Sequence, residues 1–489
     1  MITLGKIVPS WLDRDLALLF IGRGLRSLSQ GFLAIIVPLY LALLGFGAVQ
    51  IGVLFAAGAL AGAVLTAVVG MLSDRLGRTA VLVAIAVLSV GGGLAFALSG
   101  DFVVLVLAAG LGTIGRGGGA GSGGAAGPFA PAEQALIGEH AGDTARTSAF
   151  GLVSFVGVAA GAVGSLLALV PAALKTAGDL SLLESYRLLF LLSAVLGAAL
   201  ALVVAPVREH RRTPVDVRSS ASQGNPRATE VSPTGGRLLD DPAPRTGPFG
   251  MSRASWNVTL RFMVTNATNG LAIGVLGSFV VYWFYRRFGV GASEIGLLFF
   301  IINLAGAVPD LLASRVARKV GVVRSIVATR AISAVLLGAM AIMPTFLWAA
   351  SLYLVRMVVN TFANPIRQSY LMGIVDPRDR SNAAGLSNLP SQVGAAISPS
   401  ITGYLMQEIA LSLPLELAAG LQAINTVLYY LFFRKIHPPE ERERGRMPEP
   451  ERALRLVGFV NTSPSLAGAT TAPSVRWLPT HHDPWEERV

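Results

Sequence analysis

The sequence predicts an all-α polytopic membrane protein in which twelve transmembrane helices form two parallel six-helix repeats. Of the 489 residues, 53% are hydrophobic and only 14% are charged, whereas about a quarter of the residues in a soluble protein are charged. Apolar runs of about 20 residues, the length that crosses a bilayer as a helix, recur along the chain. An internal repeat, described below, divides these runs into two equal sets.

The apolar runs define the helices in order, and charged or proline-rich stretches between them are expected to be loops. The predicted helices cover residues 16–44, 51–72, 79–99, 102–126, 148–170, 186–206, 256–285, 293–313, 325–345, 347–371, 383–406 and 417–435. Residues 209–254 are rich in Arg, Pro, Ser and Gly, a composition that buries too little apolar surface to fold. We therefore expect an N-terminal six-helix bundle, a disordered cytoplasmic linker, a C-terminal six-helix bundle and a disordered cytoplasmic tail, at 1–208, 209–254, 255–436 and 437–489.

The two bundles repeat one sequence pattern. Residues 45–55 match residues 289–299 at a constant offset of 244, and the matches include polar loop positions. A second block beginning at Pro131 matches one beginning at Pro365 at an offset of 234. Because each copy holds an even number of spans, the two copies have the same orientation and are related by an axis along the membrane normal.

Basic residues concentrate in alternate loops. With both termini inside, the predicted inner segments hold 29 of the 39 Lys and Arg residues, and the outer loops hold four. The positive-inside rule therefore predicts a multi-pass protein of the plasma (inner) membrane with both termini cytoplasmic. The same distribution attributes the net charge of +11 to membrane topology, so we expect the lipid bilayer and not nucleic acid as the partner.

A short charged turn joins the second and third apolar runs, with the sequence Gly70-Met71-Leu72-Ser73-Asp74-Arg75-Leu76-Gly77-Arg78. Its spacing and position resemble the G-x-x-x-D-R-x-G-R loop between the second and third helices of the major facilitator superfamily. The resemblance covers about residues 1–436. It implies a twelve-helix transporter with a substrate site between its halves and rocker-switch alternating access.

The resemblance also implies a gate formed by Gly70, Asp74, Arg75, Gly77 and Arg78. In such a gate, Gly70 permits close helix approach, and Asp74 faces the positive N-terminal end of the eleventh helix. The second repeat has Ser314 and Arg318 where the first has Gly70 and Asp74. We therefore expect gating to be asymmetric.

Six arginines lie within predicted helices, namely Arg23, Arg26, Arg116, Arg261, Arg330 and Arg356. Each would cost about 2.5–3.5 kcal/mol at a lipid-facing central position. We expect Arg26, Arg116 and Arg356 to face a cavity or a partner, and the other three to snorkel or to form structural pairs. Glu133 and Asp310, inside or beside helix ends, are the candidates for proton coupling. Uncompensated arginines in a cavity favour an anionic or zwitterionic substrate, although bonds to helix-end carbonyls and polar side chains explain them equally well.

The candidates for lining a substrate cavity are Arg26, Gln30, Arg116, Asn269, Tyr282, Arg356, Asn360 and Gln392. Any polar member of this set could equally form a hydrogen bond between helices. The glycine-rich fourth helix around Arg116 loosely resembles the helix-4 arginine motif of proton-coupled members of the family. The fifth helix, with Gly157, Gly161 and Gly164, resembles the glycine-rich antiporter motif without its usual Gly-Pro pair.

These likenesses favour a secondary active transporter, an antiporter that carries out efflux of a small organic molecule coupled to protons. One alternative is an uptake or exchange permease for an organic anion. Another is a non-transporting membrane receptor or scaffold, for which the long central loop would be suited.

Several classes of chemistry are excluded by the composition. Cysteine is absent, which excludes disulfides, thiol catalysis and Cys-ligated metal. The glycine-rich run at 115–124 follows an apolar helix and lacks the Lys-Ser or Lys-Thr of a phosphate-binding loop. No metal-ligand spacing, paired carboxylates or Ser-His pair is visible. We therefore expect a monomeric protein that is not an enzyme and needs no cofactor or metal.

Overall fold

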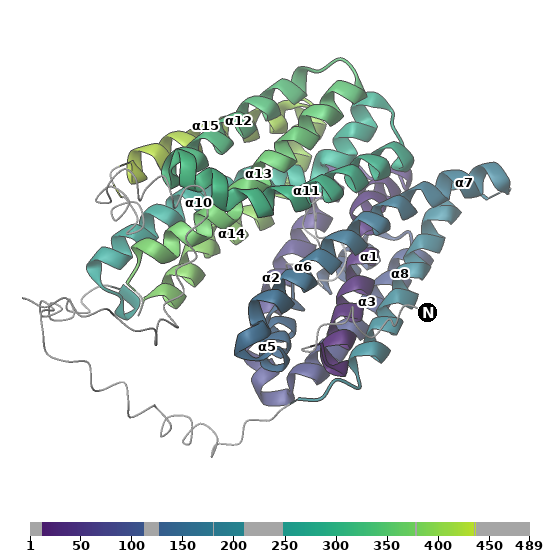
Figure 1. The fold of residues 1–489 in the computed structure, drawn as a ribbon. Helices are drawn as coiled ribbons and strands as arrows, with labels where there is room; N and C mark the ends of the chain where they lie inside the picture. Colours follow the sequence, from purple (N-terminus) through teal and green to yellow (C-terminus); the bar gives the residue numbers. More distant parts are fainter. Residues whose placement is uncertain are drawn as a thin grey trace, which may run out of the picture. The chain divides into compact units, whose positions relative to one another are not determined.

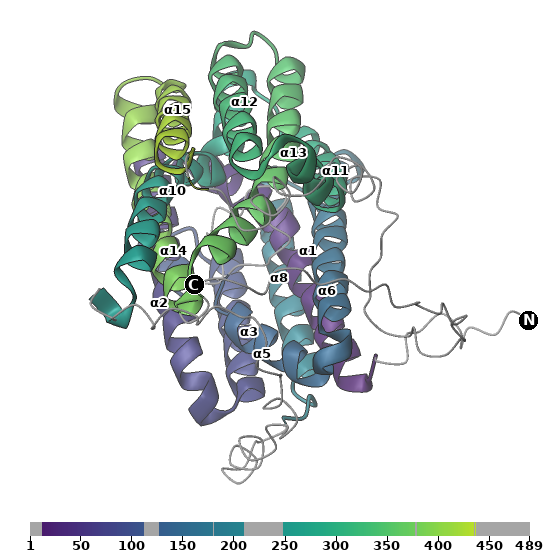
Figure 2. The same ribbon diagram turned by 60° about the vertical axis from the view of Figure 1, so that its left-hand side comes forward.

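The computed structural model describes residues 12–111, 127–178, 180–209, 248–376, 379–434 and 436. The helices of the first half are α1 (Arg14–Leu43), α2 (Ala48–Leu76), α3 (Arg78–Leu98), α4 (Phe102–Gly110), α5 (Ala130–His140), α6 (Gly142–Leu166), η2 (Leu167–Leu169), α7 (Val170–Ala177) and α8 (Leu182–Val204). Those of the second half are η4 (Pro248–Gly250), α10 (Arg253–Phe288), α11 (Ala292–Val320), α12 (Val322–Ile342), α13 (Phe346–Ile374), α14 (Arg380–Glu408) and α15 (Leu413–Phe433). Figures 1 and 2 label the main helices in two views.

The described helices confirm the predicted class of all-α polytopic membrane protein. Among the described residues, seven helices are long and apolar enough to cross a membrane, or eight if the bent α10 counts as one span. Shorter apolar stretches among the described residues are Ala292–Gly306 of α11 and Phe346–Phe362 of α13.

The repeat seen in the sequence recurs in the backbone. Helices α2 and α11, α3 and α12, and α4 and α13 each begin 244 residues apart. Gly45 and Gly289 both have positive φ before α2 and α11, and Gly77 and Gly321 both have positive φ before α3 and α12. A left-handed turn at a fixed place strongly favours glycine. The same turns therefore recur at the same offset in both halves. The Gly45 end of the helices is the end at which Gly45 and Gly289 lie, and the Gly77 end is the opposite one, at which Gly77 and Gly321 lie.

One predicted loop is helical in the structure. The stretch before the fifth predicted helix contains α5, so Glu133 lies within a helix. Charged residues made this stretch look solvated, whereas here Glu133 and Glu139 pair with arginines within the protein. The tenth predicted helix already contained Arg367, and α13 continues slightly beyond its predicted end, to Ile374. Residues 210–247 and 437–489, most of the expected linker and the tail, lie outside the described residues.

Each half is held by the same helix neighbours. In the first half, α1 packs against α6 and α8, and α3 packs against α8 (Figure 1). In the second half, α10 packs against α14 and α15, and α12 packs against α13 and α15. The halves contact each other through α2 with α14 (Figure 2) and through α6 with α11.

Glycines allow the closest of these contacts between halves. A side chain at Gly52 of α2 would collide with the carbonyl oxygen of Pro399 of α14. A side chain at Gly296 of α11 would collide with the carbonyl oxygen of Ser165 of α6. The glycines are 244 residues apart and the carbonyl residues 234, so the two contacts are equivalent by the repeat. Small residues permit such backbone approach between membrane helices.

Polar side chains reinforce both contacts near the Gly45 end. The Gln407 side chain accepts a hydrogen bond from the backbone N–H of Val49, at 3.1 Å. The Asn303 side chain donates to the Ser165 hydroxyl at 3.4 Å. The two halves are therefore closed against each other at the ends of α2 and α11 that lie near Gly45 and Gly289.

We predict that Gly52→Ala separates α2 from α14 near Val49, because its methyl group has no room beside Pro399. Overpacking of this kind costs about 1–3 kcal/mol. The measurement is disulfide cross-linking between Val49→Cys and Gln407→Cys, in a chain that has no native cysteine. The expected yield is severalfold lower than in the Gly52 parent. Gly306→Ala is the matched control, since open space surrounds Gly306, and equal yields in the two variants would contradict the prediction.

Candidate functional site

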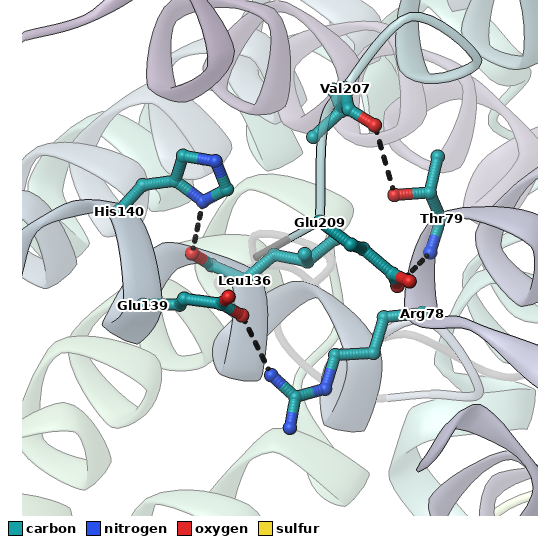
Figure 3. A network of polar contacts seen from close by, with 7 residues as sticks. All are labelled: Arg78, Thr79, Leu136, Glu139, His140, Val207 and Glu209. Atoms are coloured by element: carbon teal, nitrogen blue, oxygen red, sulfur yellow. Dashed lines mark hydrogen bonds and ion pairs between the residues drawn. The ribbon is translucent and has the colours of Figure 1, made fainter. Parts of the chain in front are cut away.

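The charged turn between α2 and α3 is bound to other parts of the first half (Figure 3). Gly77 begins α3 and has no side chain with which to cap it. Glu209, which follows α8, fills this role by accepting a hydrogen bond from the Thr79 backbone N–H at 2.8 Å. The Thr79 hydroxyl donates to the Val207 carbonyl at 3.2 Å. A carboxylate at the positive end of a helix is stabilising, so the segment after α8 fixes the start of α3.

Arg78 joins the same turn to α5. Its guanidinium lies 2.9 Å from the Glu139 carboxylate, in the last turn of α5 (Figure 3). The next residue, His140, lies against the Leu136 carbonyl and has Nε2 3.6 Å from the Asp15 carboxylate at the start of α1. The C-terminal end of α5 therefore contacts both the turn and α1.

The other predicted gate residues are less constrained. Among the described residues, no atom lies within 4 Å of where a Gly70 side chain would be, so the close helix approach expected at Gly70 stays a prediction. Arg75 is exposed. The side chain of Asp74 lies outside the described residues, so its role stays a prediction.

A buried cluster of three charges joins α1 to α5. Glu133 of α5 lies 2.7 Å from the Arg26 guanidinium and 3.3 Å from that of Arg23. All three residues are at most 7% exposed. The Arg26 guanidinium also lies over the Phe129 ring, 4.7 Å from its centroid, which is a favourable cation–π geometry. Of the two alternatives expected for Arg23, the structure shows a structural pair and not snorkelling, because Glu133 provides a partner inside the protein.

One helix therefore carries both charge contacts of the first half. Glu133 and Glu139 are six residues apart on α5, and they bind α1 and the Arg78 turn respectively. Along α5, the buried cluster at Glu133 lies less than two helical turns from Glu139, which binds Arg78. A movement of α1 relative to α5 at this cluster therefore acts close to the loop between α2 and α3. This arrangement can couple the charge state of a buried carboxylate to the position of the loop between α2 and α3.

The second half contains arginines inside the protein that have no acidic partner among the described residues. Arg330 of α12 donates to the side-chain oxygens of Asn269 and Asn425, both at 2.7 Å. Arg367 of α13 donates to the side-chain oxygen of Asn266 at 2.5 Å. Among the described residues, no carboxylate is paired with either arginine. These contacts connect α12 and α13 to α10, and α12 to α15.

Arg356 near the middle of α13 is the least satisfied of the buried arginines. It is 3% exposed, and among the described contacts its hydrogen-bond partner is the Met357 sulfur at 3.8 Å. Its Nε has no partner. A buried guanidinium with only a thioether beside it is energetically costly, so this position favours a negatively charged ligand.

The structure separates the remaining cavity candidates. Tyr282 is buried, Gln30 and Asn360 are half-buried, and Gln392 is exposed. Arg116 and the side chain of Asp310 lie outside the described residues. The structure thus brings together Arg26 with Glu133, and Asn269 with Arg330.

Sequence reasoning missed several partners. Their contacts lie at least 61 positions away in the chain, and these partners are Glu139, Glu209, Arg367 and Asn425. The second repeat block did contain one usable signal, because its offset of 234 aligns Glu133 with Arg367. That alignment marks a position where the two halves carry opposite charges.

Comparisons with known proteins agree with this geometry. The family model of the Major Facilitator Superfamily matches residues 19–358 and 262–484. The chain is 26% identical over 402 residues to the "Uncharacterized membrane protein YJR124C" of Saccharomyces cerevisiae, which covers 80% of this chain and 88% of that protein.

Solved structures show the same fold. The nucleoside transporter NupG superimposes with a TM-score of 0.62 at 13% identity, over 86% of this chain and 99% of that one. A bacterial homologue of the human lysosomal transporter Spinster, in an inward-facing and unoccupied conformation, gives 0.63 at 15% identity, over 87% and 98%. At such low identity these structures inform about the fold alone.

We predict that Glu133→Gln destabilises the protein by about 3–5 kcal/mol, because it leaves Arg23 and Arg26 buried without a negative partner. Glu139→Gln removes a more exposed ion pair and should cost no more than about 1 kcal/mol. Chemical unfolding of the two purified variants measures the difference. Equal losses would show that Glu133 does not balance the buried arginines.

Proposed function

The chain belongs to the Major Facilitator Superfamily, and we propose that it is a secondary active transporter that exports a small organic molecule against protons. It acts as a monomer in the plasma membrane, with both termini in the cytoplasm. The observation that carries the proposal is the buried cluster of Arg23, Arg26 and Glu133. An ionisable residue enclosed among membrane helices is costly to keep there and indicates a functional role such as proton transfer.

Alternating access is supported by the contacts between halves. The equivalent contacts at Gly52 and Gly296 give the two halves matching pivots near the Gly45 end. In the orientation that the basic loops favour, the Gly45 end is extracellular and the Gly77 end is cytoplasmic. Closure near Gly45 then corresponds to an inward-facing state, and rocking about the two contacts would open the outer side.

Proton coupling follows from the chemistry of Glu133. When it is ionised, the carboxylate holds Arg23 and Arg26 against α5. A proton on Glu133 removes the negative charge and leaves two neighbouring guanidinium groups of like sign. The protonated and ionised forms therefore favour different arrangements of α1 and α5, and a proton shifts the equilibrium between them.

The turn at Arg78 transmits this change to the cytoplasmic gate. Arg78 is bound to α5 through Glu139, and Thr79 is bound to Glu209. A displaced α5 would pull on the loop between α2 and α3 or release it. Asp74 completes this gate in the proposal, as the resemblance to the family implies.

A second candidate function is uptake or exchange of an organic anion. Arg356 favours it, since the Met357 sulfur is the hydrogen-bond partner of this buried guanidinium among the described residues. A carboxylate or similar group on a substrate would satisfy it. Under this alternative Glu133 would serve mainly to balance Arg23 and Arg26.

We predict that proteoliposomes with an acidic lumen accumulate a transported compound from a panel of drug-like cations and organic anions. Glu133→Gln should still exchange the compound but should lose most of the stimulation by the pH gradient, because it cannot release a proton. The exposed Glu416→Gln is the control and should respond like the parent. Stimulation that survives in Glu133→Gln would rule out this residue as the coupling site.

We further predict that Asp74→Asn and Arg78→Gln slow turnover severalfold while changing substrate affinity little, because the gate is remote from the substrate. Flux and equilibrium binding are measured on the same preparations. Arg434→Gln, which removes an exposed cytoplasmic charge, is the control. Unchanged flux in both gate variants would contradict the proposed lock.

A further inference from the structure

Packing of the first helix in each half fixes how buried residues correspond between the halves. A side chain at Gly31 of α1 would collide with Gly161 of α6, and one at Gly274 of α10 would collide with Ala395 of α14. Residues 31 and 274 differ by 243, and residues 161 and 395 differ by 234. Positions on α1 therefore correspond to positions 243 later on α10.

By this correspondence, a cluster of polar side chains in the first half is equivalent to one in the second half, but the charged residues occupy opposite helices in the two clusters. Arg23 and Arg26 of α1 correspond to Asn266 and Asn269 of α10, which are also buried. Glu133 of α5 corresponds to Arg367 of α13 at the offset of 234 found in the sequence.

Equivalent residues are hydrogen-bonded in both halves, but the donor and the acceptor have exchanged helices. Arg23 donates to Glu133 in the first half. Arg367 donates to Asn266 in the second half. A side-chain hydrogen bond thus joins α1 to α5 in the first half and α10 to α13 at the equivalent position in the second half. The second half has an arginine, Arg367, where the first half has the carboxylate of Glu133.

Among the described residues, the reversal leaves positive charge in the second half without an acidic partner. Arg330 and Arg367 bind Asn269 and Asn266, which lie about one turn apart on α10. The third described partner, Asn425, is also neutral. A buried carboxylate of this half, Asp379, accepts from the Ser252 backbone N–H at the start of α10. Two neighbouring like charges inside the protein are unfavourable without an anion between them.

Unused donors lie in the same cluster. Among the described residues, the buried Nε of Arg330 and the buried hydroxyl of Tyr429 have no hydrogen-bond partner. Tyr429 is one helical turn after Asn425 on α15, and its ring lies 6.1 Å from that of Phe262. Phe262 lies at the same distance from Tyr370, which is one turn after Arg367 on α13. Tyr429, at 1% exposure, is therefore enclosed between the helices that carry the two arginines.

We propose that the second half binds a small anion between α10, α12, α13 and α15, held by Arg330, Arg367 and Tyr429. The anion supplies the negative charge that Glu133 supplies in the first half. Its chemistry is that of chloride or of a carboxylate group. Binding does not depend on transport. The identification of a bound carboxylate as part of the exported or exchanged molecule does rest on the proposed function.

The test is thermal unfolding of the full chain, purified in isethionate, a large anion that binds weakly to proteins. Chloride and acetate are titrated at constant ionic strength. The expected result is a saturable rise in the unfolding temperature with chloride, with acetate or with both. No saturable rise with either probe would overturn the proposal.

Variants locate the effect. Tyr429→Phe removes one unused donor with little change of shape, and should raise the half-saturating concentration severalfold. Tyr430→Phe, at the adjacent exposed tyrosine, should leave it unchanged. Equal shifts in the two tyrosine variants would also overturn the proposal.

A charge reversal gives a sharper result. Arg367→Glu recreates the pattern of the first half, with an internal carboxylate near Arg330, and should unfold at a temperature that no longer depends on either probe. Arg261→Gln, which removes an exposed arginine bound to the Phe432 carbonyl, should retain the dependence. An Arg367→Glu protein that still responds to the probe like the parent would contradict the assignment.

Two further measurements identify the kind of anion and test the anion site independently of the proposed transport function. Stabilisation by chloride alone identifies a free inorganic anion, whereas stabilisation by acetate identifies a carboxylate group. Arg78→Gln, expected to slow transport, should keep the anion dependence of its unfolding temperature. A loss of that dependence in Arg78→Gln would place the anion effect at the first half and overturn the site proposed here.

Discussion

Charge buried between membrane helices has to be balanced inside the protein, because the surrounding lipid offers no water to solvate it. The first half meets this constraint with Glu133, which neutralises one of two arginines and holds both against α5. The second half meets it with amide side chains, which satisfy hydrogen bonds but carry no charge. The packing of α1 on α5, and of α10 with α12, α13 and α15, follows from these two solutions.

The two halves therefore share a backbone plan and differ in their electrostatics. The glycine turns, the helix starts and the close contacts between halves recur at fixed offsets. The buried side chains at equivalent places do not recur, as Glu133 and Arg367 show most clearly. A rocking motion needs the shared backbone, since both contacts between halves must pivot together. The proposed coupling to a proton needs the difference, because it places an ionisable carboxylate beside the buried arginines in the first half, whereas the equivalent position in the second half is Arg367.

Hydrophobic runs were sufficient to predict the helices and their class, and the repeat predicted offsets that the helix starts reproduce. The runs could not predict α5, because a helix that buries Glu133 and ends in Glu139 and His140 has the composition of a loop. Partners such as Asn425 and Glu209 come from distant segments, so only the folded chain reveals them. Gly70 was assigned from a family pattern, and no neighbour lies close enough in this conformation to test why that pattern favours glycine.

Helix α5 explains how one small segment can link the buried chemistry to the gate. It is only eleven residues long, yet Glu133 faces two arginines of α1 and Glu139 holds Arg78 at the start of α3. His140 approaches Asp15, which returns to the beginning of α1. Helices are stiff over this length, so α5 moves as one body when either end is displaced. In the proposed mechanism, a proton at Glu133 and a shift of the turn at Arg78 belong to one displacement of α5, which would place the gate in the half that contains Glu133.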